Sequence, residues 1–231
     1  MNHETDETMD LPVLKDVPRF GIRILCVLTS VATCIAWVAC SNENELPYYN
    51  TPDFTPYWES SSSFSVDTLH TIAPFTFVDQ EGRNVSDKTF KDKVYVASFF
   101  FTICPGICPK LTGNMSKVAD AFKDNAEILF ISHSVTPDID SVSQLKKYAE
   151  LHGIRSSQWH LVTGNREAIY SLARQSYFAE QEIGFQLSSQ EFLHTEHFIL
   201  IDREGHIRGI YKGTLDLEAK RLIDDIHVLL D

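Results

Sequence analysis

The pattern of apolar and polar positions changes character twice along the chain. Residues 24–42 form an apolar run without a single charged residue. Residues 43–70 show no sustained period and contain three prolines and a run of serines, which is typical of a linker. From residue 71 onward, short apolar runs alternate with amphipathic segments. The pattern therefore predicts an N-terminal segment (1–42), a linker (43–70) and one folded domain (71–231).

Within the folded domain, alternating or continuous apolar runs predict strands, and apolar residues spaced three to four apart predict helices. The run at 94–101 is apolar or aromatic at nearly every position, which indicates a strand buried on both faces and therefore central in a sheet. Further strands are predicted at 72–78, 128–132, 159–162, 197–202 and 206–211, and helices at 108–124, 138–152, 166–177 and 215–230.

This order of elements predicts the α/β fold class, with a single mixed sheet and helices on both of its faces. The closing hairpin at 197–211, joined by a Gly-containing turn and followed by a last amphipathic helix, is typical of the end of a thioredoxin-like fold. We therefore expect a thioredoxin-like domain behind the N-terminal segment.

Composition excludes some classes of function. The chain has 231 residues and 43% hydrophobic content, enough for a sizeable core. Its formal net charge of -12 argues against nucleic-acid binding, which requires a basic face. Five cysteines are too few for a disulfide-built scaffold.

The N-terminal apolar run predicts attachment to a membrane. Arg19 and Arg23 precede residues 24–42, and Glu43 follows them, which places the N-terminus in the cytoplasm by the positive-inside tendency. A spanning helix needs about 20 apolar residues and a signal-peptide core about 7–15, so the run is consistent with either. It is a membrane helix or a lipoprotein signal that leaves Cys40 as a lipidated terminus. Both place the domain in the periplasm or at the outer face of the cytoplasmic membrane.

Two cysteines carry the most informative chemistry. Cys104 and Cys108 lie where the central strand ends and a helix begins. Four residues apart on a helix, they would face one side, which suits a disulfide or two thiolates that converge on one metal ion. A helix N-terminus stabilises thiolate, and Pro109 fits the first turn of a helix. The pair is therefore a candidate redox couple and a candidate pair of metal ligands.

A metal site needs a third ligand, and two histidines in the last third of the chain compete for this role. His194 directly precedes the strand at 197–202, in the loop that faces the thiol-bearing helix of a thioredoxin-like fold, and His197 is its rival. A cis-proline ordinarily stands in that loop, but the last proline of this chain is Pro137. Two soft thiolates and one imidazole favour copper, especially Cu(I). Zinc is disfavoured because no second pair of closely spaced cysteines completes four ligands.

These motifs together resemble the Sco/SenC family, copper-binding proteins of cytochrome oxidase assembly. Residues 99–112 (FFFTICPGICPKLT) resemble its CxxxCP segment, and residues 134–140 resemble its Ser-x-Asp-Pro-x-x-Asp stretch with Thr136 in place of the first Asp. Residues 159–164 resemble its Trp-x-x-x-Thr-Gly, and His194, eight residues before Asp202, resembles its metal-binding histidine.

The resemblance implies a membrane-anchored copper chaperone that holds a copper ion through Cys104, Cys108 and His194. The eight-residue spacing to Asp202 favours His194 over His197. The implied partners are the copper-centre subunit of a terminal oxidase, other copper chaperones or thiol reductants, and the membrane through the N-terminus. No classical enzyme is implied.

Two alternative activities remain open. The first is a thiol–disulfide oxidoreductase that reduces the cysteines of the oxidase copper site, with Cys104 as attacking thiolate and Cys108 as resolving thiol. The second is peroxide reduction, which fits the fold but lacks a clear arginine beside the thiols.

Overall fold

A computed structural model describes residues 45–230, apart from 60–64, 66–67, 156 and 180–194. The N-terminal segment 1–42, with Cys40, and the candidate ligand His194 lie outside the described residues. Within the described part of the chain, no helix combines the length and the apolar character needed to cross a membrane. Glu45–Asp231 forms one compact unit.

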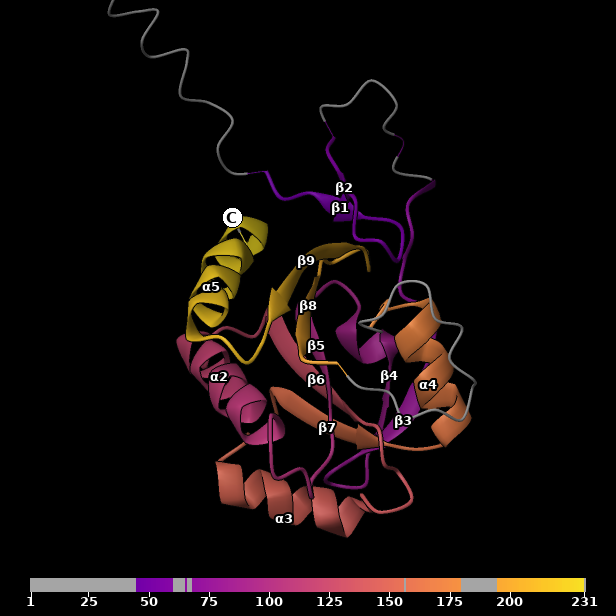
Figure 1. The fold of residues 1–231 in the computed structure, drawn as a ribbon, viewed down its shortest axis with the longest axis vertical. Helices are drawn as coiled ribbons and strands as arrows, with labels where there is room; N and C mark the ends of the chain where they lie inside the picture. Colours follow the sequence, from indigo (N-terminus) through magenta and orange to yellow (C-terminus); the bar gives the residue numbers. More distant parts are fainter. Residues whose placement is uncertain (1–44, 60–64, 66–67, 156, 180–194, 231) are drawn as a thin grey trace, which may run out of the picture. The chain divides into compact units, whose positions relative to one another are not determined.

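A mixed sheet of nine strands is the centre of the described domain (Figure 1), in the order β2-β1-β9-β8-β5-β6-β7-β3-β4. Strand β5 is parallel to β6 and antiparallel to β8. The strands are β1 (Tyr48–Tyr49), β2 (Pro56–Tyr57), β3 (Thr76–Asp79), β4 (Asn84–Ser86), β5 (Val94–Phe100), β6 (Ile128–Ser134), β7 (Trp159–Thr163), β8 (His197–Ile201) and β9 (Ile207–Lys212).

The helices cover both faces of the sheet, as the sequence predicts. Residues of α2, α3 and α5 pack in one hydrophobic cluster, and residues of α4 pack in the other. All seven residues of β5 are buried between these two clusters, which confirms that it is the central strand. The helices are α2 (Cys108–Ala121), α3 (Val142–His152), α4 (Arg166–Gln175) and α5 (Asp216–Leu230), and a short 3-10 helix, η2, spans Asp87–Phe90.

Local sequence signals set most helix ends. Asn165 caps α4 by accepting a hydrogen bond from the amide of Ala168 at 2.8 Å. Gly153 ends α3 in the left-handed region (φ 64°), where a residue with a Cβ would be strained. The sequence predicts that this helix starts at residue 138, but α3 begins at Val142, with Ser141 as its N-cap. The residues just before it form a turn in which the side chain of Asp140 is buried.

The segment predicted to be a linker contributes two strands to the sheet. Strand β1 pairs with β2 and, through Tyr49, with Ile207 of β9. The guanidinium of Arg208 donates hydrogen bonds to the carbonyl oxygens of Pro47 (3.1 Å) and Leu46 (2.6 Å). Arg208 also stacks on the ring of Tyr48, with its guanidinium carbon 3.8 Å from the ring centroid. Two-residue strands carry almost no periodic signal, so the sequence pattern could not predict them.

We expect Arg208→Ala to release the β1–β2 hairpin from the sheet. The substitution removes two hydrogen bonds to backbone carbonyls and the ion pair with the buried carboxylate of Asp202, whose Oδ2 lies 3.1 Å from Nη1 of Arg208. The combined cost is roughly 2–4 kcal/mol in the free energy of unfolding. Hydrogen–deuterium exchange should show faster exchange at 45–58 than in the wild type. Arg155→Ala, which removes an exposed ion pair with Asp120 on α2, is the control and should leave this exchange unchanged.

Candidate metal centre

The two thiols lie at the junction of the central strand and the first long helix. Strand β5 ends at Phe100, and α2 begins at Cys108, with Ile107 as its N-cap and a proline in its first turn. Cys104 is partly exposed in the connecting loop, whereas Cys108 is only 3% exposed. Both cysteines are free thiols. The structure corrects one reason for pairing them: Cys104 precedes the helix, so the two cysteines are not one helical turn apart, but their thiols still hydrogen-bond to each other.

The environment of the pair makes the two thiols chemically unequal. Burial on its own would raise the pKa of Cys104. Hydrogen bonds from the thiol of Cys108 and from the backbone amides of Cys108, Gly106 and Ile107 outweigh burial and lower this pKa. Burial raises the pKa of Cys108 to about 12, and its hydrogen bond to Cys104 adds to the increase. Cys104 is therefore the more acidic thiol of the pair, and Cys108 keeps its proton more strongly.

A buried carboxylate supports the loop that leads to Cys104. Asp140 is fully buried and accepts hydrogen bonds from the amide (3.2 Å) and the hydroxyl (2.5 Å) of Thr102. It also accepts the hydroxyls of Ser134 (2.6 Å) and Thr136 (3.0 Å). The family resemblance at 134–140 includes Asp140 and Thr136 but predicts no role for either residue. The sequence pattern does not indicate a role for Thr102.

The structure argues against His197 as the third ligand. In a strand, successive side chains point to opposite faces, so His197 shares its face with Ile199 and Ile201, which pack in the cluster of α4. Its ring lies edge-on to Phe54 at 6.2 Å. Cys108 belongs to the cluster on the other face of the sheet. His194, the predicted ligand, lies outside the described residues, and these residues alone contain no group of three or more His, Cys, Asp or Glu side chains placed to bind a metal ion.

The other buried histidines contact a carboxylate, a backbone oxygen or aromatic rings. His160 contacts the carboxylate of Asp79 at 3.2 Å, and His206 contacts the backbone oxygen of His70 at 3.0 Å. His133 on β6 is completely buried, and neither of its ring nitrogens has a hydrogen-bond partner in the described part of the chain. Aromatic rings surround it on the face of the sheet opposite to Cys108: Phe75, Phe77, Phe99 and Tyr177.

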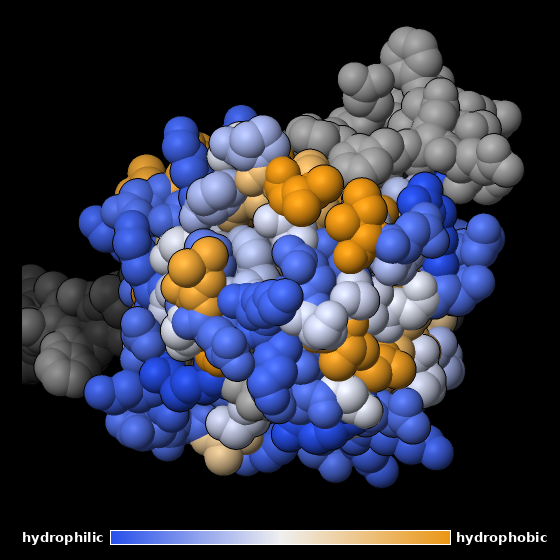
Figure 2. Space-filling model, turned by 90° about the horizontal axis from the view of Figure 1, so that it is seen from below, coloured by the Kyte–Doolittle hydropathy of each residue, from blue (hydrophilic) through white to orange (hydrophobic). Residues whose placement is uncertain are grey.

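The surface near the thiols is apolar in part. Ile103, the residue before Cys104, is 57% exposed, and Ile139, the residue before Asp140, is 50% exposed. Figure 2 looks onto the end of the domain that carries α3 and shows separate hydrophobic areas among hydrophilic side chains. Exposed aliphatic side chains beside a reactive thiol favour contact with a protein partner.

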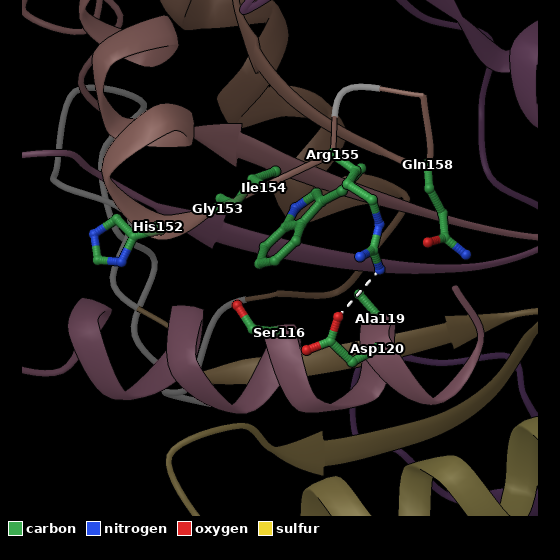
Figure 3. A pocket seen from close by; sticks show the side chains of 9 residues that line it. Ser116, Ala119, Asp120, His152, Gly153, Ile154, Arg155 and Gln158 are labelled. Carbon is green, nitrogen blue, oxygen red and sulfur yellow. Dashed lines mark hydrogen bonds and ion pairs between the residues drawn. The ribbon is translucent and has the colours of Figure 1, made fainter. Parts of the chain in front are cut away.

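A small pocket lies away from the thiols, between α2 and the segment that joins α3 to β7 (Figure 3). It has a volume of about 60 Å³, and two of its lining residues, Arg155 and Asp120, form an ion pair at 3.1 Å. The α2 residues that line it are Ser116, Ala119 and Asp120, in the second half of the helix. The pocket is therefore separate from the candidate metal centre.

A mixed sheet with a free dithiol at the start of the helix after its central strand defines a thioredoxin-like dithiol protein. The comparisons with known proteins narrow this class. The family model described as SCO1/SenC matches residues 65–231. The chain belongs to the SCO1/SenC family.

Relatives of known sequence or structure agree with this assignment. The chain is 31% identical over 157 residues to the SCO1 protein homolog of Bacillus subtilis, covering 67% of this chain and 80% of that protein. A SCO1/SenC family lipoprotein from Bacillus anthracis matches with a TM-score of 0.62 at 29% identity, over 70% of this chain and 96% of that one. BsSco, described as a Sco family cytochrome c oxidase assembly protein with a disulfide switch, matches at TM-score 0.58 and 29% identity, over 69% and 93%. Arabidopsis thaliana ScoI with copper bound matches at TM-score 0.53 and 25% identity, over 67% and 97%.

Proposed function

We propose that this protein is a copper chaperone that holds one copper ion through Cys104, Cys108 and His194 and passes it on by ligand exchange. The observation that carries the proposal is the unequal thiol pair, in which Cys104 has a lowered pKa and Cys108 contacts it directly. Soft sulfur donors select copper over hard ions. Binding must displace the proton of Cys108, so loading weakens as the pH falls.

The relatives support the choice of metal and recipient. The solved structure of Arabidopsis thaliana ScoI contains copper, and BsSco is described as an assembly factor of cytochrome c oxidase. By analogy, the recipient of this chain is the copper-centre subunit of a respiratory terminal oxidase. Other copper chaperones or thiol reductants would load or reduce the pair. The exposed Ile103 and Ile139 would contribute to such contacts.

We further propose that the N-terminal segment anchors the domain to the membrane and places it in the periplasm or at the outer face of the cytoplasmic membrane. The uncharged run at 24–42 supports an anchor, and one relative of known structure is described as a lipoprotein. Mass spectrometry of the mature N-terminus separates the two modes. A lipidated Cys40 at the terminus indicates a lipoprotein, and an intact N-terminus indicates a membrane helix.

A second function, thiol–disulfide exchange, is favoured by the exposure and the lowered pKa of Cys104. The Cys104 thiolate attacks a substrate disulfide, forms a mixed disulfide and releases one substrate thiolate. Cys108 then transfers its proton to the released substrate thiolate, attacks the sulfur of Cys104 and releases the second substrate thiolate. The substrate gains two electrons, and the protein is left with a Cys104–Cys108 disulfide, which cannot hold copper until it is reduced.

The proposed ligand set predicts different effects for two neighbouring histidines. We expect His194→Ala to weaken Cu(I) binding to the reduced full chain in detergent by at least about tenfold, because it removes one of three ligands. His197→Ala is the matched control and should bind Cu(I) as the wild type does, because its ring faces the opposite side of the sheet. The measurement is a competition titration against a Cu(I) chelator. Equal binding by all three proteins would contradict the assignment of His194.

A further inference from the structure

We propose that Asp140 is a positioning residue for the thiol pair: acting through Thr102, it holds the loop that carries Cys104 in the shape that brings the two sulfurs together. This inference rests on the proposed function, since it assigns a role at the same site. It concerns a residue that contacts neither thiol in any described hydrogen bond.

The first observation is that Thr102 is held from outside its own loop. Its amide and its hydroxyl both donate to Asp140, a residue 38 positions later in the sequence. Gln144, in the first turn of α3, donates from Nε2 to the Thr102 hydroxyl oxygen at 3.3 Å. Two residues after Thr102, the amide of Cys104 donates to the carbonyl of Phe101. The loop that carries Cys104, residues 101–107, is called the thiol loop below. Its first half is thus attached to Asp140 and to the first turn of α3.

The second observation is that Asp140 is itself immobilised. Its carboxylate is 0% exposed, and its amide donates to the carbonyl of Thr136 at 2.9 Å. The Ser134 and Thr136 hydroxyls occupy the carboxylate oxygen Oδ2 from the end of β6. The amide of Val135 donates to the carbonyl of Phe100 at 2.9 Å, which ties the ends of β5 and β6 together. A buried carboxylate with this many donors has little freedom to follow a moving loop.

These contacts leave the thiol loop fixed at both ends. Asp140 holds its start at Thr102, and helix α2 holds its end, where the amide of Leu111 donates to the carbonyl of Ile107 at 3.0 Å. Between these points lie Cys104 and two of the amides that hydrogen-bond its sulfur, those of Gly106 and Ile107. Loss of the first attachment would leave these amides free to turn away from the sulfur.

The test compares four variants of the reduced full chain in detergent. Thr102→Val removes the hydroxyl donor at nearly constant volume, and Thr102→Ser keeps it. Asp140→Asn removes the charge of the acceptor. Thr136→Val is the matched control, because it removes another donor to the same carboxylate without touching the thiol loop. The readouts are the rate of Cys104 alkylation by iodoacetamide at one fixed neutral pH, the disulfide equilibrium with glutathione, and the melting temperature.

We expect Thr102→Val and Asp140→Asn to slow alkylation of Cys104 by at least about threefold and to shift the glutathione equilibrium toward the disulfide. Thr102→Ser and Thr136→Val should stay within about twofold of the wild type in both readouts, whatever their melting temperatures. Unchanged rates in Thr102→Val, or an equal decrease in Thr136→Val, would overturn the proposal. If Asp140→Asn does not fold, the threonine variants decide.

The chaperone function and the positioning role of Asp140 can be rejected independently of each other. Alkylation and glutathione exchange require no copper. The expected response in a protein that binds no Cu(I) would reject the chaperone function and support the role of Asp140. Unchanged thiol reactivity in variants of a protein that binds Cu(I) tightly would reject the role of Asp140 alone.

Discussion

Replacing Cys108 with serine is expected to weaken Cu(I) binding by roughly 10³-fold, as loss of either thiolate ligand would. A hydroxyl is a hard, protonated donor, whereas the thiolate of Cys108 supplies one of two soft ligands. Removing an outer-shell partner of a metal site already costs about 10–100-fold, so loss of a direct ligand should cost more. The measurement is a competition titration of the reduced full chain with a Cu(I) chelator of known affinity.

The control for this prediction lies on the same buried face of α2. Met115 is 1% exposed, and Met115→Leu conserves its volume while removing a sulfur atom. This variant should bind copper like the wild type, which would show that the effect of Cys108→Ser comes from ligation and not from packing. A Cys108→Ser protein that binds Cu(I) within about threefold of the wild type would remove the thiol pair from the proposed site.

Replacing His133 with phenylalanine should both stabilise the protein and reduce its sensitivity to acid. Burial lowers the pKa of His133 to about 3, far below the 6.5 of an exposed histidine. The unfolded chain therefore takes up a proton below about pH 6.5 that the folded protein excludes until about pH 3. Over that range the wild type loses about 1.4 kcal/mol of stability per pH unit relative to His133→Phe. Above about pH 6.5 this pH-dependent part of the difference vanishes.

At neutral pH a smaller gain remains. The two ring nitrogens of His133 have no hydrogen-bond partner among the described residues, and each unsatisfied buried polar atom costs about 1–3 kcal/mol. Phenylalanine matches the aromatic rings around the site and needs no partner. Urea unfolding at pH 7.5 and pH 4.5 measures both effects, with His227→Phe, on the exposed side of α5, as control. Parallel pH dependence in the wild type and His133→Phe would contradict the argument.

The sequence predicts the parts of the fold that repeat a local pattern. The continuous apolar run at 94–101 predicted the central strand, and the spacing of Leu111, Met115 and Val118 predicted the buried face of α2. The predicted strand at 72–78 is shorter in the structure, because only Thr76–Asp79 pairs with its neighbours. Pairing depends on partners distant in the sequence, and no local pattern encodes it.

The sequence also predicts only part of the candidate site. The position of Cys104 and Cys108 could be read from a strand followed by a proline-containing helix start. Their unequal pKa values could not, since the inequality depends on how deeply each sulfur is buried and on which amides face it. The support of the loop by Asp140 depends on a contact across 38 residues, which a single sequence does not reveal.

The β1–β2 hairpin has a consequence for how the protein would meet its partners. It pairs with Ile207, at the end of β9 that lies beside Ile201 and hence beside Tyr95, at the start of β5. The thiols follow the other end of β5, so the polypeptide enters the domain at the pole opposite its reactive sulfurs (Figure 1). Arg208 holds the hairpin at that end of the sheet. A partner that binds beside the dithiol would therefore not need to displace residues 45–58.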